Sequence, residues 1–135
     1  MTPEQVLDWI GEIGIVPVVR ASSSAHALEA VEAIEAGGIT VVEITMTVPN
    51  AISTIREVVA RSGQRVLVGA GTISNAEQAR ASIDAGAQFL VSPGLSVTVL
   101  EVGRTLGALA CAAANRGLQL LWAHRNDGRG SGGAS

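Results

Sequence analysis

The stretch Val41-Val42-Glu43-Ile44-Thr45-Met46 has the length of a β-strand and carries one carboxylate inside an otherwise apolar run. Side chains alternate between the two faces of a strand, so the run divides into two sets. One face carries Val42, Ile44 and Met46, and the other carries Val41, Glu43, Thr45 and Thr47. We expect the apolar face to pack against helices and the mixed face to line either a barrel interior or the crevice of a sheet.

Three further apolar runs of strand length accompany this one: Ile15 to Val19, Val66 to Val68 and Phe89 to Val91. Continuous runs of Val, Ile and Leu are typical of a parallel sheet covered by helices. The intervals between the runs have helical apolar spacing and end at glycines, so we predict four successive βα units. Such units fit a doubly wound sheet or half of a (β/α)₈ barrel of the TIM type, and periodicity leaves both open.

Local signals mark where helices begin. Ser24 is the expected N-cap of the first helix between strands, and Ser74 with Glu77 forms an S-x-x-E capping box before the third. On the N-terminal segment, Trp9 is expected to cover an end of the sheet.

The composition predicts one compact domain, with 47% hydrophobic residues among 135 and a net charge of -3. No basic cluster precedes the C-terminal tail, so nucleic acid is not an expected partner. The longest uncharged stretch is shorter than the ~18 apolar residues of a membrane helix, so no membrane is expected either. A single cysteine and an acidic N-terminus that does not resemble a secretory signal favour the cytoplasm. No Cys or His pair has metal-ligand spacing, and we expect no metal and no cofactor.

Glu43 is the leading catalytic candidate. A carboxylate that faces a dry interior has a raised pKa and can transfer protons near neutral pH. The alternative is a structural carboxylate paired with Arg20 or with a hydroxyl.

Other candidates lie where strands end, which is the edge at which parallel α/β sheets bind ligands. Arg20 ends the first strand and could hold a carboxylate or phosphate. Thr72 follows the glycines of Gly69-Ala70-Gly71, which let a ligand approach the backbone, and the turn Ser92-Pro93-Gly94 ends the fourth strand. The alternatives are a surface arginine at a strand end for Arg20 and a strand-end turn without a ligand for the segment that ends at Thr72.

The remaining reactive side chains receive the simpler interpretation. Cys111 has no histidine near it at a strand end and is taken as a free thiol. His26 and His124 are taken as solvated side chains.

Four motifs in order resemble the 2-keto-3-deoxy-6-phosphogluconate and 4-hydroxy-2-oxoglutarate aldolases. They are Gly14 to Arg20, Val42 to Thr47, Val68 to Thr72 and Gly86 to Leu95, and the resemblance runs from about Val6 to Leu106. It implies a (β/α)₈ barrel, usually a trimer, that acts as a lyase of carbohydrate metabolism in the Entner–Doudoroff pathway. The implied substrate is a small 2-keto-4-hydroxy acid, cleaved through a Schiff base to pyruvate and an aldehyde.

The resemblance also implies roles for residues. Glu43 would be the general acid/base, Thr72 and Ser92-Pro93 would contact the pyruvate-derived part, and Arg20 would lie beside them. Many members have arginine where this chain has Thr47, at the position that contacts the substrate carboxylate.

The pattern breaks after Leu106. Residues 107–135 contain no Val or Ile and match neither the sixth strand, which carries the family's Schiff-base lysine, nor its phosphate loops. All nine basic residues are arginine, so this chain has no amine for the imine. We divide the chain into an N-terminal half barrel, residues 1–106, and an Ala/Gly/Arg-rich tail, residues 107–135, expected to be disordered. A shifted reading frame is one hypothesis for the break.

A half barrel is expected to be marginally stable, because a complete one needs ~250 residues and closes its strand edges. Self-association or aggregation is the expected result. Three interpretations remain: an aldolase by descent that is inactive alone, a non-catalytic half barrel that pairs with itself or docks on a partner, and another phosphate-binding barrel such as a thiamine-phosphate-synthase-like enzyme.

Overall fold

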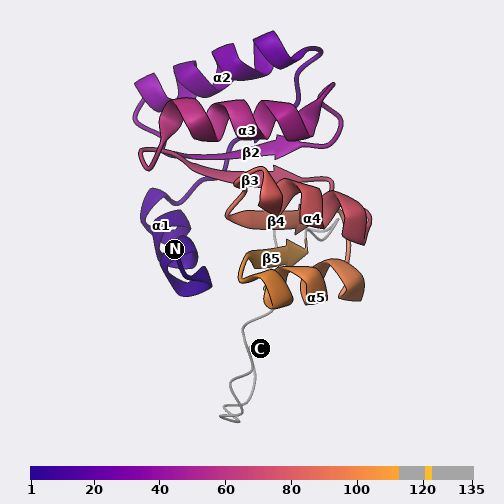
Figure 1. Cartoon of the computed structure of the whole chain (residues 1–135). Coiled ribbons are helices and arrows are strands. Elements are labelled where there is room, and N and C mark those ends of the chain that lie inside the picture. Colours follow the sequence, from indigo (N-terminus) through magenta and orange to yellow (C-terminus); the bar gives the residue numbers. More distant parts are fainter. Residues whose placement is uncertain (113–120, 123–135) are drawn as a thin grey trace.

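The structure is a computed structural model that describes residues 1–112 and 121–122. In chain order the elements are α1 (Pro3–Ile13), β1 (Val18–Val19), α2 (Ser24–Ala36), β2 (Val41–Thr45), α3 (Ala51–Ser62), β3 (Leu67–Gly71), α4 (Ala76–Asp84), β4 (Phe89–Ser92), α5 (Val97–Leu106), β5 (Leu109–Ala112) and β6 (Leu121–Trp122) (Figure 1). The predicted disorder and the frameshift hypothesis for the tail concern mainly residues outside the described ranges.

The strands form one sheet in the order β1-β2-β3-β4-β5-β6. Neighbours from β1 to β5 run parallel, and β6 pairs antiparallel with β5. A doubly wound sheet reverses its strand order at a switch point, whereas a barrel adds each strand beside the previous one. The observed order is that of a (β/α) barrel, and the predicted four βα units are confirmed.

The two faces of the sheet belong to different hydrophobic clusters. The outer core lies between the sheet and helices α2 to α5 and includes Val42, Ile44 and Leu90. The inner core lies on the opposite face and joins Val6, Val41, Leu67, Phe89, Leu109 and Cys111. The alternation predicted for β2 is therefore correct, since Val42 and Ile44 face the helices while Val41 faces the interior.

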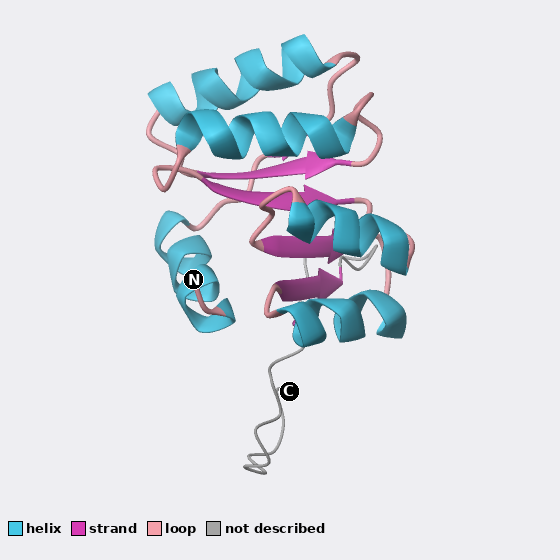
Figure 2. Ribbon diagram, in the orientation of Figure 1, coloured by secondary structure: helices cyan, strands magenta, loops and turns pink. Residues whose placement is uncertain are grey.

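Helix α1 covers the inner core near the end where the strands begin (Figure 2). Val6 is 1% exposed within that cluster, and the indole Nε1 of Trp9 donates a hydrogen bond to Thr40 Oγ1 at 3.0 Å, just before β2. The expectation that Trp9 covers an end of the sheet is confirmed. Among the described helices, none has both the length and the apolar character needed to cross a membrane.

Two predicted helix caps are wrong by one residue. Ser23, not Ser24, caps α2 and accepts from the backbone of His26. The cap of α4 is Asn75, whose side chain accepts from the backbone N–H of Gln78 at 2.8 Å. Each observed cap residue is adjacent to the predicted serine. Several consecutive residues here are good N-caps, so residue type alone could not identify the capping position.

The absence of Val and Ile after Leu106 predicts no strand beyond the fourth βα unit, and this prediction is wrong. Leu109–Ala112 forms β5, which pairs parallel with β4 from Phe89↔Leu109 to Ser92↔Ala112. The strand consists of small and apolar residues because α5 packs closely on it. A Cβ at Gly103 of α5 would lie 2.8 Å from the Cβ of Ala110.

Candidate active site

Glu43 lies in the middle of β2 on the inner face of the sheet, as predicted. The residue is only 8% exposed. Burial raises the pKa of its carboxyl group, and the nearby positive charge of Arg20 opposes this by lowering it. Within residues 1–112 the ion pairs are surface Arg–Glu pairs that leave Glu43 out, so its carboxylate is not held by a direct ion pair with Arg20.

Arg20 follows β1 at the carboxyl end of that strand. It lies two residues after Val18, which pairs with Glu43, so alternation places both Val18 and Arg20 on the side of the sheet that Glu43 faces. Arg20 is exposed, in contrast to the buried Glu43. The guanidinium is thus available to an anion at the strand end while its charge still reaches the carboxylate.

Two threonine hydroxyls continue the inner face beyond Glu43. Thr45 is fully buried, and its Oγ1 lies 2.6 Å from Oγ1 of the exposed Thr47 and 3.5 Å from the carbonyl oxygen of Val19. The sequence singled out Thr47 and passed over Thr45. The position of Thr45 on the same strand face as Glu43 was the signal that could have identified it as a site residue.

Thr72 sits directly after β3 with a positive φ of 57°. Left-handed backbone in a β-branched residue costs ~1–3 kcal/mol and occurs most often at functional sites. Thr72 is partly exposed, at the same strand-end edge as Arg20 and Thr47. The backbone at this candidate is therefore held in a conformation that serine or threonine rarely adopts without support from its neighbours.

Ser92 is the last residue of β4 and Pro93 follows it, and the two side chains differ in exposure. Ser92 is fully buried, with its hydroxyl 2.5 Å from the carbonyl oxygen of Gly94 and 3.4 Å from that of Cys111. Strand alternation puts Ser92 on the outer side, opposite to Val91 of the inner core. Its hydroxyl therefore shapes the turn, and Pro93 is the exposed member of the pair.

Cys111 on β5 is a site neighbour that the sequence did not reveal. Its thiol is free and buried in the inner core. Burial, with a further contribution from the charge of Glu43, raises the pKa of the thiol to about 11. The sequence pattern did not predict β5, so it gave no indication that Cys111 lies on a strand near Glu43.

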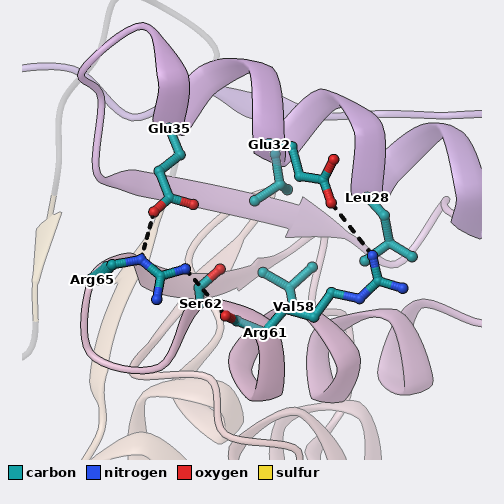
Figure 3. A pocket seen from close by; sticks show the side chains of 8 residues that line it. Leu28, Glu32, Glu35, Val58, Arg61, Ser62 and Arg65 are labelled. Atoms are coloured by element: carbon teal, nitrogen blue, oxygen red, sulfur yellow. Dashed lines mark hydrogen bonds and ion pairs between the residues drawn. The ribbon is translucent and has the colours of Figure 1, made fainter.

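A separate hollow lies on the outer surface between α2 and α3, with a volume of about 150 Å³ (Figure 3). Its rim carries ion pairs of Arg61 with Glu32 at 3.4 Å and of Arg65 with Glu35 at 2.9 Å. Val31 and Val58 line it from the outer core, so this hollow lies on the opposite side of the sheet from Glu43.

Parallel strands in consecutive order, with a buried acid on the inner face and polar groups at the carboxyl ends, define the chain as part of a (β/α)-barrel protein of the TIM class. The sequence pattern of the family described as "KDPG and KHG aldolase" matches residues 6–112. The chain belongs to this family of class I aldolases.

Individual relatives agree with the assignment. The KHG/KDPG aldolase of Escherichia coli strain K12 is 38% identical over 87 residues, which are 64% of this chain and 40% of the relative. The solved KDPG aldolase of Zymomonas mobilis ZM4, with 3-phosphoglycerate, covers 83% of this chain and 53% of its own at 28% identity and a TM-score of 0.72. The solved KDPG aldolase of Legionella pneumophila, with pyruvate captured as a covalent carbinolamine, is 31% identical with a TM-score of 0.67. The match covers 73% of this chain and 48% of the Legionella chain. The chain spans about 40% of the length of the first curated relatives.

Proposed function

We propose that this chain carries the acid-base part of an aldolase site for a 2-keto-4-hydroxy acid, and that Glu43 moves the proton. The burial of Glu43 carries the proposal. A carboxyl group that is 8% exposed and whose pKa is raised by desolvation can hold a proton closer to neutral pH than an ordinary glutamate.

The chemistry assigns a distinct task to the carboxylate. Cleavage removes the proton from the C4 hydroxyl as the C3–C4 bond breaks, and the bonding electrons pass to an imine at C2. The aldehyde leaves, and a proton returned to C3 gives pyruvate after hydrolysis of the imine. On an imine formed by an amine from outside this chain, Glu43 would accept the first proton and return the second.

The other candidates bind rather than transfer protons. Arg20 and Thr47 bind the carboxylate of the substrate at the ends of β1 and β2, and Thr72 contacts the pyruvate-derived part from the end of β3. Ser92 holds the turn that presents Pro93. The exposure of Arg20, Thr47 and Pro93 at one edge of the sheet supports these roles.

The imine needs an amine, and the sequence contains no lysine. We therefore assign no Schiff-base aldolase activity to the isolated chain. To test this, the purified chain is incubated with pyruvate and sodium borohydride, and its intact mass is measured by mass spectrometry. No covalent pyruvate adduct is expected, and an adduct would refute this part of the proposal. A Glu43 carboxyl that titrates at an ordinary pKa in ¹³C NMR would refute its acid-base role.

A second candidate function is a non-catalytic half barrel that pairs with another copy. It is favoured by the edge strand β1, where Val18 is 48% exposed and the nearby Ile15 is 54% exposed. Within the described strands, β1 has β2 as its partner on one side only. A melting temperature that rises with protein concentration, and that loses this dependence in Val18→Lys, would support pairing through this edge.

A further inference from the structure

The inner face of β3 carries no side chain at two successive inward positions, Gly69 and Gly71. Side chains from the two flanking strands fill the space instead. The ring of Phe89 from β4 lies over Gly69, where its Cδ2 would be 2.5 Å from an added Cβ and its Cε2 and Cζ closer still. The side chain of Glu43 from β2 lies over Gly71, where Cδ and Cγ would be 2.6 and 2.9 Å from an added Cβ, and Oε1 closer still.

The strand register shows that Glu43 leans along the sheet. Its direct partner on β3 is Gly69, while Gly71 pairs with Thr45. The carboxylate nevertheless lies over Gly71, two residues nearer the carboxyl end of the strand. Because Phe89 already occupies the space above Gly69, the only vacant place on β3 for the Glu43 side chain is the one above Gly71.

Shape rather than hydrogen bonding holds the carboxylate there. Within residues 1–112, no side-chain hydrogen bond involves the carboxylate of Glu43. The charge of Arg20 lowers the pKa of this carboxylate without forming an ion pair with it. The three nearest atoms to a Cβ at Gly71 all belong to Glu43.

We propose that Gly71 is a positioning residue for the Glu43 carboxylate, and that it acts by leaving a vacant place on β3 which directs the acid toward the strand ends. The inference rests on the acid-base role proposed for Glu43. Any side chain at position 71 would displace the carboxylate. Since Phe89 blocks movement back toward Gly69, the carboxylate would move outward into solvent.

The test is the titration of the Glu43 carboxyl by ¹³C NMR, assigned with Glu43→Gln, in the full chain and in Gly71→Ala. The pKa is expected to fall toward the ordinary value of 4.5 in Gly71→Ala, because the displaced carboxylate regains solvent. The matched control is Gly103→Ala, which crowds Ala110 on the outer side of the sheet at 2.8 Å and leaves Glu43 untouched. An unchanged Glu43 pKa in Gly71→Ala, or an equal fall in the control, would overturn the inference.

A second measurement applies even where Gly71→Ala does not fold. Because the three atoms nearest to the added methyl group all belong to Glu43, Glu43→Ala/Gly71→Ala should fold, and Gly71→Ala should cost less stability in the Glu43→Ala background than in the full chain. An equal loss of stability in both backgrounds would overturn the inference. An ordinary Glu43 pKa in the unsubstituted chain would instead refute the acid-base role, while the cost of Gly71→Ala with and without Glu43 would still report on the placement of the carboxylate over Gly71, so the two failures are distinguishable.

Discussion

Gly69→Ala should destabilise the chain, because the ring of Phe89 occupies the place of the new methyl group. An added Cβ would lie 2.5 Å from the Cδ2 atom of the ring and nearer to two further ring atoms. Non-bonded carbon atoms rest about 3.5 to 4.0 Å apart, so the ring or the strand must move by about 1 Å or more. Phe89 is 1% exposed, so a displaced ring would lose contacts with the close-packed side chains around it.

The expected loss follows from two opposing contributions. Overpacking a core of this kind costs ~1–3 kcal/mol. Replacing glycine by alanine in a strand recovers ~0.5–1 kcal/mol of conformational entropy. The net destabilisation is therefore up to about 2.5 kcal/mol, to be compared with the ~5–15 kcal/mol that stabilises a typical domain.

The assay is a double-mutant cycle measured by urea denaturation with far-UV circular dichroism. Phe89→Val removes Cδ2, Cε2 and Cζ, the three ring atoms nearest to the added methyl group, so Gly69→Ala should cost less than about 0.5 kcal/mol in that background. Gly11→Ala is the control, because an added Cβ there meets no atom within 4 Å. The reasoning fails if Gly69→Ala costs the same with Phe89 and with valine at that position.

Three further outcomes are expected. In urea denaturation, Glu43→Gln should be more stable than the wild type at pH 8 and equally stable at pH 4. Burial raises the pKa of Glu43 in the folded state above its value in the unfolded state, so ionising Glu43 at pH 8 costs the folded chain ~1.4 kcal/mol for each pKa unit between the two states. A stability difference that does not change with pH would contradict this. Alkylation of Cys111 by iodoacetamide should be slow at pH 8 and accelerate toward the thiol pKa of about 11, and Glu43→Gln should move this profile to lower pH because Glu43 contributes to the raised value; an unmoved profile would refute the coupling. Trp9→Phe should lower the free energy of unfolding by ~0.5–1.5 kcal/mol, because it removes the hydrogen bond to Thr40. In the Thr40→Val background the same substitution should cost less. Additive losses in the double variant would show that the hydrogen bond contributes nothing.

The sequence predicted those parts of the fold whose pattern is strong and local. Alternation along β2 correctly divided Val42 and Ile44 from Glu43, because the two faces of that strand differ greatly in polarity. Strand β5 escaped prediction, since Leu109–Ala112 contains no β-branched residue and owes its conformation to pairing with β4 and to the close approach of α5. Propensity carries no trace of such tertiary contacts.

The glycines of β3 show a different limit. From the sequence, Gly69 and Gly71 indicated a place where a ligand could approach the backbone. In the structure, the side chains of Phe89 on β4 and Glu43 on β2 occupy the space above these glycines. A single chain read residue by residue cannot tell which neighbour will fill a vacancy, because the answer depends on strand register.

The environment of the acid and the supply of the amine are separable in this fold. Glu43 is 8% exposed although its pairing partner on β1, Val18, is 48% exposed at the free edge. The burial that raises the pKa of Glu43 therefore does not require β1 to be covered by a further strand. Gly71 of β3 provides the vacant place for the carboxylate, and Phe89 of β4 closes the direction toward Gly69, so these neighbours suffice to direct it. It follows that the raised pKa of Glu43 does not depend on a lysine in this chain, and that titration of Glu43, not turnover, is the measurement that tests its proposed acid-base role.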